Sequence, residues 1–280
     1  MIGDIINLMR TRQWYKNLVV FLPLVFLVRF FEGGALIKVV LAFAALCLVS
    51  SANYALNDVV DFKKDKLNSE KKNRPVASGR MSRGFGLLIG FILLFGGLLI
   101  SLNIGAFLPV AGLFLLGQLY NFWLKNEAFV DVLIISVNFV IRAVTGGVVL
   151  GAQISPWLVL CTFFLALFLS VGKREAEIKF LGRGGSELHR MVSRFYTREV
   201  TNSFMIISTT SLIVSYSLYS FLSNFNLLLT LPFSLYVIFR YVYLVYSGSE
   251  IARHPELVVK DLRLVVGILL WVGVTFLLVY

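Results

Sequence analysis

The chain has 280 residues, of which 58% are hydrophobic, and it carries a formal net charge of +11. Its mean hydropathy of +0.85 and an apolar content above the roughly half found in soluble domains exclude an ordinary soluble protein. Several runs reach the length of about 20 apolar residues that a membrane-spanning helix needs, and none alternates as membrane β-strands do. The composition therefore predicts an all-α integral membrane protein.

Apolar runs divide the chain into nine predicted membrane spans. In chain order they cover residues 17–32, 36–57, 84–102, 105–123, 130–150, 156–178, 203–222, 227–247 and 262–280. The longest polar stretches, 58–83 and 179–202, are too short for a soluble domain and are interpreted as cytoplasmic active-site loops. We therefore predict a single membrane domain over residues 1–280, built as a nine-helix bundle.

The N-terminal segment precedes the first span. Ile2, Ile5, Ile6 and Met9 recur at helical spacing, and no small-residue cleavage site follows them. Residues 1–16 are therefore predicted to form an amphipathic helix at the membrane interface rather than a signal peptide.

The basic residues predict the orientation of the chain, because short cytoplasmic loops are rich in Lys and Arg. Arg29 and Lys38 lie beside the connection between the first two spans, and Arg142 and Arg240 lie deeper within spans. The other basic residues fall in the N-terminal segment and in the loops after spans two, four, six and eight. We predict a multi-pass protein of the cell (plasma or inner) membrane with a cytoplasmic N-terminus and an external C-terminus. This topology explains the positive charge, and no basic and aromatic module indicates nucleic-acid binding.

An acidic motif, "NDVVDFKKD", follows the second span directly. Asn57, Asp61 and Asp65 recur every four residues and Asp58 is adjacent, so a continuing helix would place them in one stripe. Stacked carboxylates repel one another unless they share a cation, and oxygen-only ligands suit Mg²⁺. The alternative is a solvated acidic helix end whose carboxylates pair with neighbouring lysines.

The loop after the acidic stripe reads "KKNRPVASGR" and supplies cations. Arg74 lies there with Lys71, Lys72 and Arg80, so donors for phosphate oxygens follow the carboxylates closely. "NDVVDFKKD" followed by "NRPVASG" resembles the first Asp-rich motif of the UbiA-type membrane prenyltransferase superfamily. The resemblance implies a cytoplasmic-facing active-site cavity and Mg²⁺ held by Asn57, Asp58, Asp61 and Asp65. It also implies catalytic roles for Asp58 and Asp61 and phosphate binding by Arg74.

The end of the sixth span departs from the usual second Asp-rich motif. It reads "GKREAEI", without Asp, and Lys173 and Glu177 share a helix face beside Arg174. Spacing alone leaves open a phosphate site or an ordinary basic helix end. "GKREAEI" resembles the signature of one branch of the superfamily, the decaprenyl-phosphate phosphoribosyltransferases. "RTRQWYKNLVVFLPL", "YNFWLK" and "VDVLIISVNFVIRAVTGG" also resemble segments of that branch.

That branch implies Mg²⁺-dependent transfer of 5-phosphoribose from 5-phosphoribosyl 1-diphosphate to a polyprenyl phosphate, such as a decaprenyl-like lipid. We expect Glu177 to be catalytic, with Asp131 as a second candidate to stabilise a developing positive charge. The expected substrate-binding residues are Lys16, Arg74, Tyr120, Lys125, Arg142, Lys173 and Arg174. One alternative is a prenyltransferase that moves a prenyl group from a prenyl diphosphate to an aromatic or lipid acceptor, which predicts a second diaspartate motif. A membrane transporter is another.

An arginine within a span, Arg142, costs at least a few kcal/mol unless it faces protein or water. Asp131, Asn138 and Arg142 share one helix face, so an internal ion pair and a contact with substrate phosphate both remain open. The loop "GRGGSELHRMVSRFYTRE" is interpreted either as a lid over the donor or as an interfacial helix. Cys47 and Cys161 are interpreted as small apolar fillers, and neither His189 nor His254 is nominated for catalysis.

Overall fold

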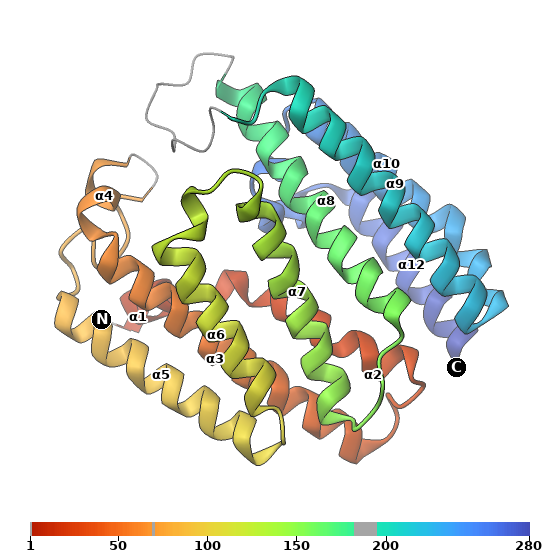
Figure 1. Cartoon of the computed structure of the whole chain (residues 1–280), viewed down its shortest axis with the longest axis horizontal. Helices are drawn as coiled ribbons and strands as arrows, with labels where there is room; N and C mark the ends of the chain where they lie inside the picture. Colours follow the sequence, from red (N-terminus) through yellow and green to blue (C-terminus); the bar gives the residue numbers. More distant parts are fainter. Residues whose placement is uncertain (1, 69–70, 182–194) are drawn as a thin grey trace. The chain divides into compact units, whose positions relative to one another are not determined.

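The computed structural model describes residues 2–68, 71–181 and 195–280, and every regular element in these ranges is helical. The chain runs through these elements in order (Figure 1). The α-helices are α1 (Ile2–Met9), α2 (Leu22–Phe26), α3 (Gly33–Val60), α4 (Phe62–Leu67), α5 (Arg83–Asn103), α6 (Phe107–Phe122), α7 (Val130–Val149), α8 (Pro156–Leu181), α9 (Arg198–Ser223), α10 (Leu231–Tyr246), α11 (Glu250–Arg253) and α12 (Leu262–Val279). The 3-10 helices are η1 (Thr11–Phe21), η2 (Leu124–Asn126), η4 (Phe225–Thr230) and η5 (Pro255–Lys260).

Long apolar helices confirm a multi-pass membrane protein. Within the described residues, 7 helices are long and apolar enough to cross a membrane, and Phe107–Phe122 is a shorter apolar helix. The predicted first span, 17–32, differs most from expectation. It consists of the end of a 3-10 helix and the five-residue α2, which has Pro23 in its first turn. The nine-span count and the cytoplasmic cavity therefore stay predictions.

The chain divides into two compact units. Unit 1 comprises Met1–Leu24, Arg29–Trp123 and Ile141–Gln153, and unit 2 comprises Val25–Val28, Leu124–Val140 and Ile154–Tyr280. Helix α7 contributes its first half to unit 2 and its second half to unit 1.

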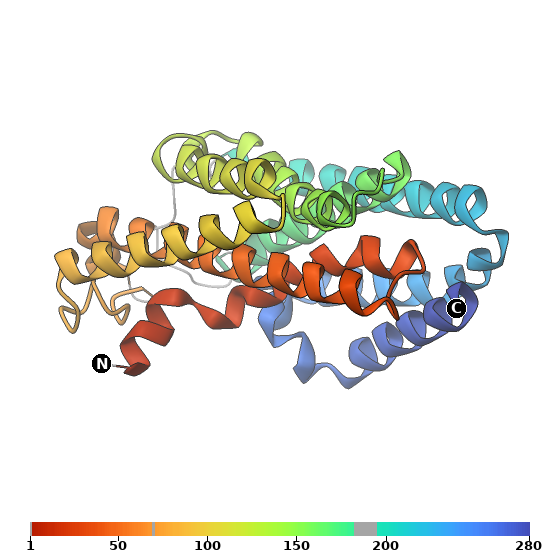
Figure 2. The ribbon, with the colours of Figure 1, turned by 90° about the horizontal axis from the view of Figure 1, so that it is seen from below.

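In unit 1, α3 packs along α5, and the two helices run alongside each other in both views (Figures 1 and 2). Small residues permit the close approach. A Cβ atom at Gly97 would lie 2.6 Å from Val49 Cγ2, and one at Gly90 would lie 3.4 Å from Ala55 Cβ. Helices in membranes commonly pack through small residues, since van der Waals contact drives their association. This packing fixes the acidic end of α3.

The N-terminal segment also packs on α3. The predicted amphipathic helix over residues 1–16 is an α-helix only as far as Met9, because Arg10 adopts left-handed backbone angles (φ 49°, ψ 50°) and a 3-10 helix follows. The Trp14 Nε1–H donates to Ser51 Oγ at 3.1 Å, and the Ser51 hydroxyl donates to the Met9 carbonyl at 2.9 Å. These bonds hold the turn at Arg10 against α3.

Unit 2 is built around α8, which packs on α9 and α10. Its core contains Phe168, Met205 and Tyr241. Gly172 lies where α8 meets α10, and a Cβ atom there would be 3.0 Å from both Tyr241 Cε1 and Val245 Cγ2. The close packing at Gly172 fixes the next residues of α8, which carry the "KREAE" sequence.

Candidate active site

The acidic stripe begins at the end of α3 and continues through a bend. Helix α3 ends at Val60, Asp61 has φ −87° and ψ 7°, and α4 follows. The backbone N–H of Asp61 still donates to the Asn57 carbonyl, and that of Asp65 to the Asp61 carbonyl, both at 2.9 Å. The four-residue spacing therefore survives a bend that the sequence did not predict.

The lysines of the motif face away from the carboxylates. Lys63, Lys64 and Lys66 are exposed, whereas Asp58 and Asp65 are buried. Among the described residues none of these three lysines forms an ion pair. The structure thus disagrees with the alternative in which neighbouring lysines neutralise the stripe.

Two arginines pair with the buried carboxylates instead. Arg74 Nη1 lies 3.1 Å from Asp58 Oδ1 and 2.7 Å from Asp65 Oδ2. Arg10 Nη2 also donates to Asp58 Oδ1, and its guanidinium lies 4.7 Å from the centre of the Tyr54 ring. We name Asp58, Asp65, Arg10 and Arg74 the acidic cluster.

Arg10 was not among the predicted site residues. It stands 48 positions before Asp58, and no periodicity links the two. The segment "RTRQW" does resemble the start of the decaprenyl-phosphate phosphoribosyltransferase branch. That resemblance was the sequence feature that could have indicated Arg10. Burial is the main cause that lowers the pKa of the Arg74 guanidinium, and the nearby charge of Arg10 lowers it further. The ordinary arginine pKa is so high that Arg74 stays charged.

The acidic cluster can be tested for its fit to Mg²⁺. Asp58 is 1% exposed, and its Oδ2 atom is buried without a hydrogen-bond partner among the described residues. No group of three or more His, Cys, Asp or Glu side chains in the described ranges is close enough to hold a metal ion. Mg²⁺ needs only one or two carboxylates when waters and substrate phosphates complete its shell. An oxygen-only donor set with one open carboxylate oxygen therefore fits Mg²⁺.

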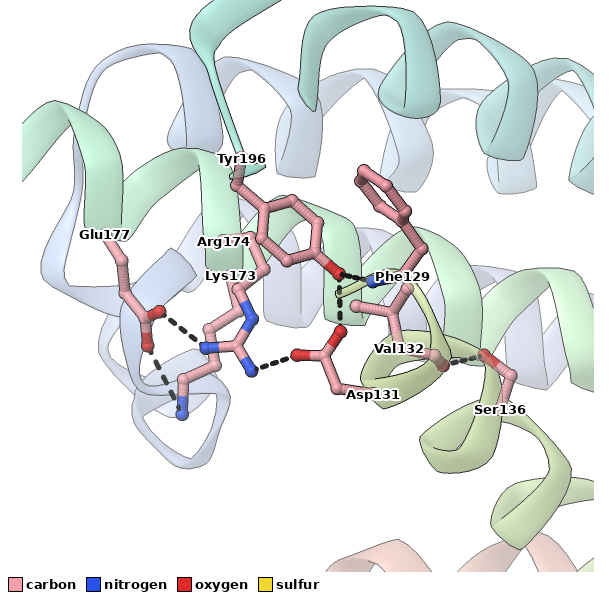
Figure 3. A network of polar contacts seen from close by, with 8 residues as sticks. All are labelled: Phe129, Asp131, Val132, Ser136, Lys173, Arg174, Glu177 and Tyr196. Atoms are coloured by element: carbon pink, nitrogen blue, oxygen red, sulfur yellow. Dashed lines mark hydrogen bonds and ion pairs between the residues drawn. The ribbon is translucent and has the colours of Figure 1, made fainter. Parts of the chain in front are cut away.

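A second polar network surrounds Arg174 of α8 (Figure 3). Arg174 Nη2 lies 2.6 Å from Asp131 Oδ2, and Nη1 lies 3.0 Å from Glu177 Oε2. The Tyr196 hydroxyl donates to Asp131 Oδ1 and accepts the Phe129 N–H at 3.1 Å. We name Asp131, Arg174, Glu177 and Tyr196 the arginine cluster. Both oxygens of Asp131, which is fully buried, are engaged.

The environment keeps Tyr196 protonated. Burial, followed by the hydrogen bond to the Asp131 carboxylate, raises the pKa of Tyr196 above its usual value. A neutral phenol donates its hydrogen to Asp131 at physiological pH. Lys173 lies at the edge of this cluster, with Nζ 3.9 Å from Glu177 Oε1. Lys173 and Glu177 therefore lie on one helix face, as their i,i+4 spacing predicted.

Arg142 has a different partner from the one considered. Its Nε–H donates to Asn17 Oδ1 at 2.7 Å, and Arg142 is 7% exposed. A direct ion pair with Asp131 is not formed, because eleven residues of helix separate the two by about 16 Å. Asp131 and Arg142 do share a helix face, but the rise along the helix places them too far apart to form an ion pair.

Besides Arg142, three predicted substrate-binding residues lie apart from both clusters by the contacts described. Lys16 Nζ lies 5.9 Å from the centre of the Tyr15 ring. Tyr120 near the end of α6 and Lys125 in η2 are half-buried. The proposed lid sequence, including His189, lies outside the described residues except for its last positions, which include Tyr196. The roles of Lys16, Tyr120 and Lys125 stay predictions.

Known proteins resemble this chain along nearly its whole length. The profile of the UbiA prenyltransferase family matches residues 18–254. The decaprenyl-phosphate phosphoribosyltransferase of Mycolicibacterium smegmatis is 31% identical, over 98% of this chain and 91% of that protein. The protein of the same name from Corynebacterium glutamicum is 33% identical, over 77% of this chain and 67% of its own. A solved UbiA homolog from Archaeoglobus fulgidus bound to DMAPP and Mg²⁺ has a TM-score of 0.75 at 18% identity, covering 99% of each chain.

Proposed function

This chain belongs to the UbiA prenyltransferase family, and we propose that it is a membrane phosphoribosyltransferase. It moves 5-phosphoribose from 5-phosphoribosyl 1-diphosphate to a polyprenyl phosphate and releases diphosphate. The observation that carries the proposal is the 31% identity, over 98% of the chain, to a decaprenyl-phosphate phosphoribosyltransferase. The arginine cluster supports it, because a guanidinium at this place suits phosphate, to which arginine forms charge-assisted hydrogen bonds.

The acidic cluster holds the leaving diphosphate in this proposal. Asn57, Asp58, Asp61 and Asp65 are the residues that hold Mg²⁺, with Asp58 and Asp61 nearest to the chemistry. When bound, Mg²⁺ neutralises charge that develops on the departing diphosphate. The Arg74 guanidinium, already oriented by Asp58 and Asp65, donates to the diphosphate oxygens.

The remaining predicted residues bind the substrates and stabilise the reacting centre. Arg174 and Lys173 donate to a substrate phosphate, and Glu177 stabilises positive charge at the anomeric carbon. Lys16, Tyr120, Lys125 and Arg142 add polar contacts to the substrates. A phosphate oxygen of the lipid forms the new bond to the anomeric carbon as the bond to diphosphate breaks. That oxygen is ionised at neutral pH, so the chain needs no general base, and positioning with electrostatics supplies the catalysis.

The distribution of basic residues supports one orientation in the cell membrane. We place the N-terminus and the acidic end of α3 on the cytoplasmic side and the C-terminus outside, with nine spans. A water-soluble phosphoribosyl donor is then available at the acidic end, and the polyprenyl phosphate reaches it through the bilayer.

A second candidate is prenyl transfer from a prenyl diphosphate to a lipid or aromatic acceptor. The digeranylgeranylglyceryl phosphate synthase of Sulfurisphaera tokodaii is 33% identical, over 40% of this chain. This candidate requires a second site for a metal-bound diphosphate. The sequence at that place, "GKREAEI", offers Arg174 and Lys173 instead of aspartates, which disfavours it.

The test offers purified protein two labelled donors with Mg²⁺. One reaction contains labelled phosphoribosyl diphosphate and a polyprenyl phosphate, and the other contains labelled prenyl diphosphate and an aromatic acid. We expect lipid-extractable label from the first pair, lost in Asp61→Ala and kept in Asp4→Ala, whose carboxylate pairs with Arg80 away from the cluster. Label from the second pair alone would overturn the proposal.

A further inference from the structure

A cavity of about 240 Å³ lies in unit 1 where α3 begins. It is lined by Arg29, Glu32, Gly34, Ala35, Lys38 and Leu150, together with one further apolar residue. Lys38 and Asp58 are twenty residues apart on α3, which is about 30 Å at 1.5 Å per residue. That distance equals the thickness of the hydrocarbon core of a bilayer. The cavity therefore lies at the membrane boundary opposite the acidic cluster.

The two cations of this cavity retain unused hydrogen-bond donors. Arg29 donates Nε–H and an Nη2–H to Glu32 Oε2, both at 2.8 Å, and an Nη1–H to the Leu150 carbonyl at 2.9 Å. A guanidinium has five N–H groups, so two remain without a partner among the described residues. The Lys38 ammonium is exposed and makes no ion pair or hydrogen bond within the described chain. Because Glu32 balances Arg29, the cavity carries one uncompensated positive charge.

The backbone at the start of α3 adds further donors to the same place. The Leu36 N–H is the first that bonds back along the helix, to the Glu32 carbonyl at 2.9 Å. Gly34 and Lys38 are four residues apart and share a helix face. A Cβ atom at Gly34 would meet nothing within 4 Å, so an anion can approach the backbone closely there. Helix N-termini favour anions, and here they adjoin an unpaired ammonium inside a cavity.

The residues around the cavity combine cations with exposed apolar side chains, which is the combination that a lipid headgroup and its acyl chains need. Arg29 and Lys38 are the only charged residues besides Glu32 between Asn17 and Asn57. Phe31 and Ile37, which are 74% and 62% exposed, flank them with apolar surface. We infer that this cavity binds the phosphate group of an anionic membrane lipid at the boundary opposite the reaction, with acyl chains against the exposed apolar side chains.

The test measures binding of short-chain phosphatidylglycerol to the purified full chain in detergent, from the rise in melting temperature that a bound ligand produces. We expect Lys38→Ala to weaken binding about tenfold, because it removes a charge-assisted contact, and Lys38→Arg to retain it. Lys64→Ala is the matched control, since Lys64 is also an exposed lysine without a partner in the described chain, at the acidic end of unit 1.

Two further measurements distinguish a bound lipid from a free phosphate compound, and specific binding from simple charge attraction. Gly34→Leu fills the cavity and is expected to abolish binding while leaving the melting temperature without lipid unchanged. Glycerol phosphate, which has no acyl chains, tests for a free phosphate compound, and equally tight binding of it would overturn the lipid assignment. Equal losses in Lys38→Ala and Lys64→Ala, or none in Lys38→Ala, would overturn the site itself.

Discussion

Asp58 of the acidic cluster and Asp131 of the arginine cluster are both almost fully buried, yet their carboxylates are satisfied differently. Arg10 and Arg74 donate to a single oxygen of Asp58, and its Oδ2 atom has no partner among the described residues. Asp131 receives Arg174 on one oxygen and Tyr196 on the other. A buried polar atom without a partner is costly, so the acidic cluster gains when a ligand fills it. In the arginine cluster, both Asp131 oxygens already have partners without a ligand.

This difference assigns a role to each aspartate. The Oδ2 atom of Asp58 is available to a cation, and Arg10 and Arg74 both donate to the other carboxylate oxygen. Each oxygen of Asp131 already accepts a hydrogen bond, and Asp131 and Glu177 hold the Arg174 guanidinium through its two terminal nitrogens. We therefore propose that Asp131 acts as a positioning residue, as an alternative to the direct electrostatic role first considered for it. Removing Asp58 should affect chemistry, and disturbing Asp131 should affect stability first.

The largest expected effect is on the activity of Asp58→Asn. The amide keeps the size of the side chain but loses the charge that a cation needs, so we expect phosphoribosyl transfer to fall at least about 100-fold, as when one electrostatic stabiliser is lost from an active site. Label transfer measured over a range of Mg²⁺ concentrations checks this. Asp4→Asn, which changes a carboxylate that pairs with Arg80 outside the acidic cluster, is the control and should keep its activity. More than a tenth of the wild-type rate in Asp58→Asn would contradict the role of the open oxygen.

Particular residues show how far sequence reasoning reached. The four-residue spacing from Asn57 to Asp65 persists because backbone hydrogen bonds continue through the bend at Asp61. Arg74 was predicted because it follows the stripe closely in sequence. Arg10 was missed because a left-handed turn, not a periodic pattern, brings it to Asp58. The partner of Asp131 could not be read from one helix face, since Arg174 and Tyr196 come from elements far along the chain. The roles of the site residues stay predictions until they are tested.

The next largest effect is expected on the stability of Arg174→Ala. This change leaves the buried Asp131 carboxylate without its cation, and breaking a buried ion pair costs about 3–5 kcal/mol. Because Tyr196 still donates to Asp131, we expect the lower end, about 3 kcal/mol, measured by denaturant unfolding in detergent. Lys173→Ala is the control, since the Lys173 side chain is 45% exposed and its Nζ lies 3.9 Å from Glu177 Oε1, and exposed pairs contribute roughly 0–1 kcal/mol. Equal losses in both variants would remove the contrast between buried and exposed pairs.

A smaller loss of stability is expected for Tyr196→Phe. The variant keeps the ring but removes the donor to Asp131 Oδ1 and the acceptor for the Phe129 N–H. Leaving such groups without a hydrogen-bond partner costs about 1–3 kcal/mol. In the variant, Asp131 keeps a partner on only one of its two oxygens, as Asp58 does. Tyr243→Phe serves as the control because the Tyr243 ring is 60% exposed. An unchanged unfolding free energy in Tyr196→Phe would show that the completed network does not depend on this hydroxyl.

The smallest effect is expected for Asp261, an aspartate at a helix end. It serves as a comparison for the two buried aspartates, Asp58 and Asp131. Arg240 Nη2 lies 2.7 Å from Asp261 Oδ2, and this hydrogen bond is the main cause that lowers the pKa of Asp261 below its usual value of 3.8. A lowered pKa stabilises the folded state above pH 3.8 and loses that contribution as the pH falls through the folded-state value. We therefore expect the wild type to melt about 1–2 °C above Asp261→Asn at pH 7, with the gap narrowing as the pH falls below 3.8. A gap that stayed constant with pH would mean that Asp261 acts through its hydrogen bond to the Leu264 N–H, which asparagine retains in part, and not through its charge.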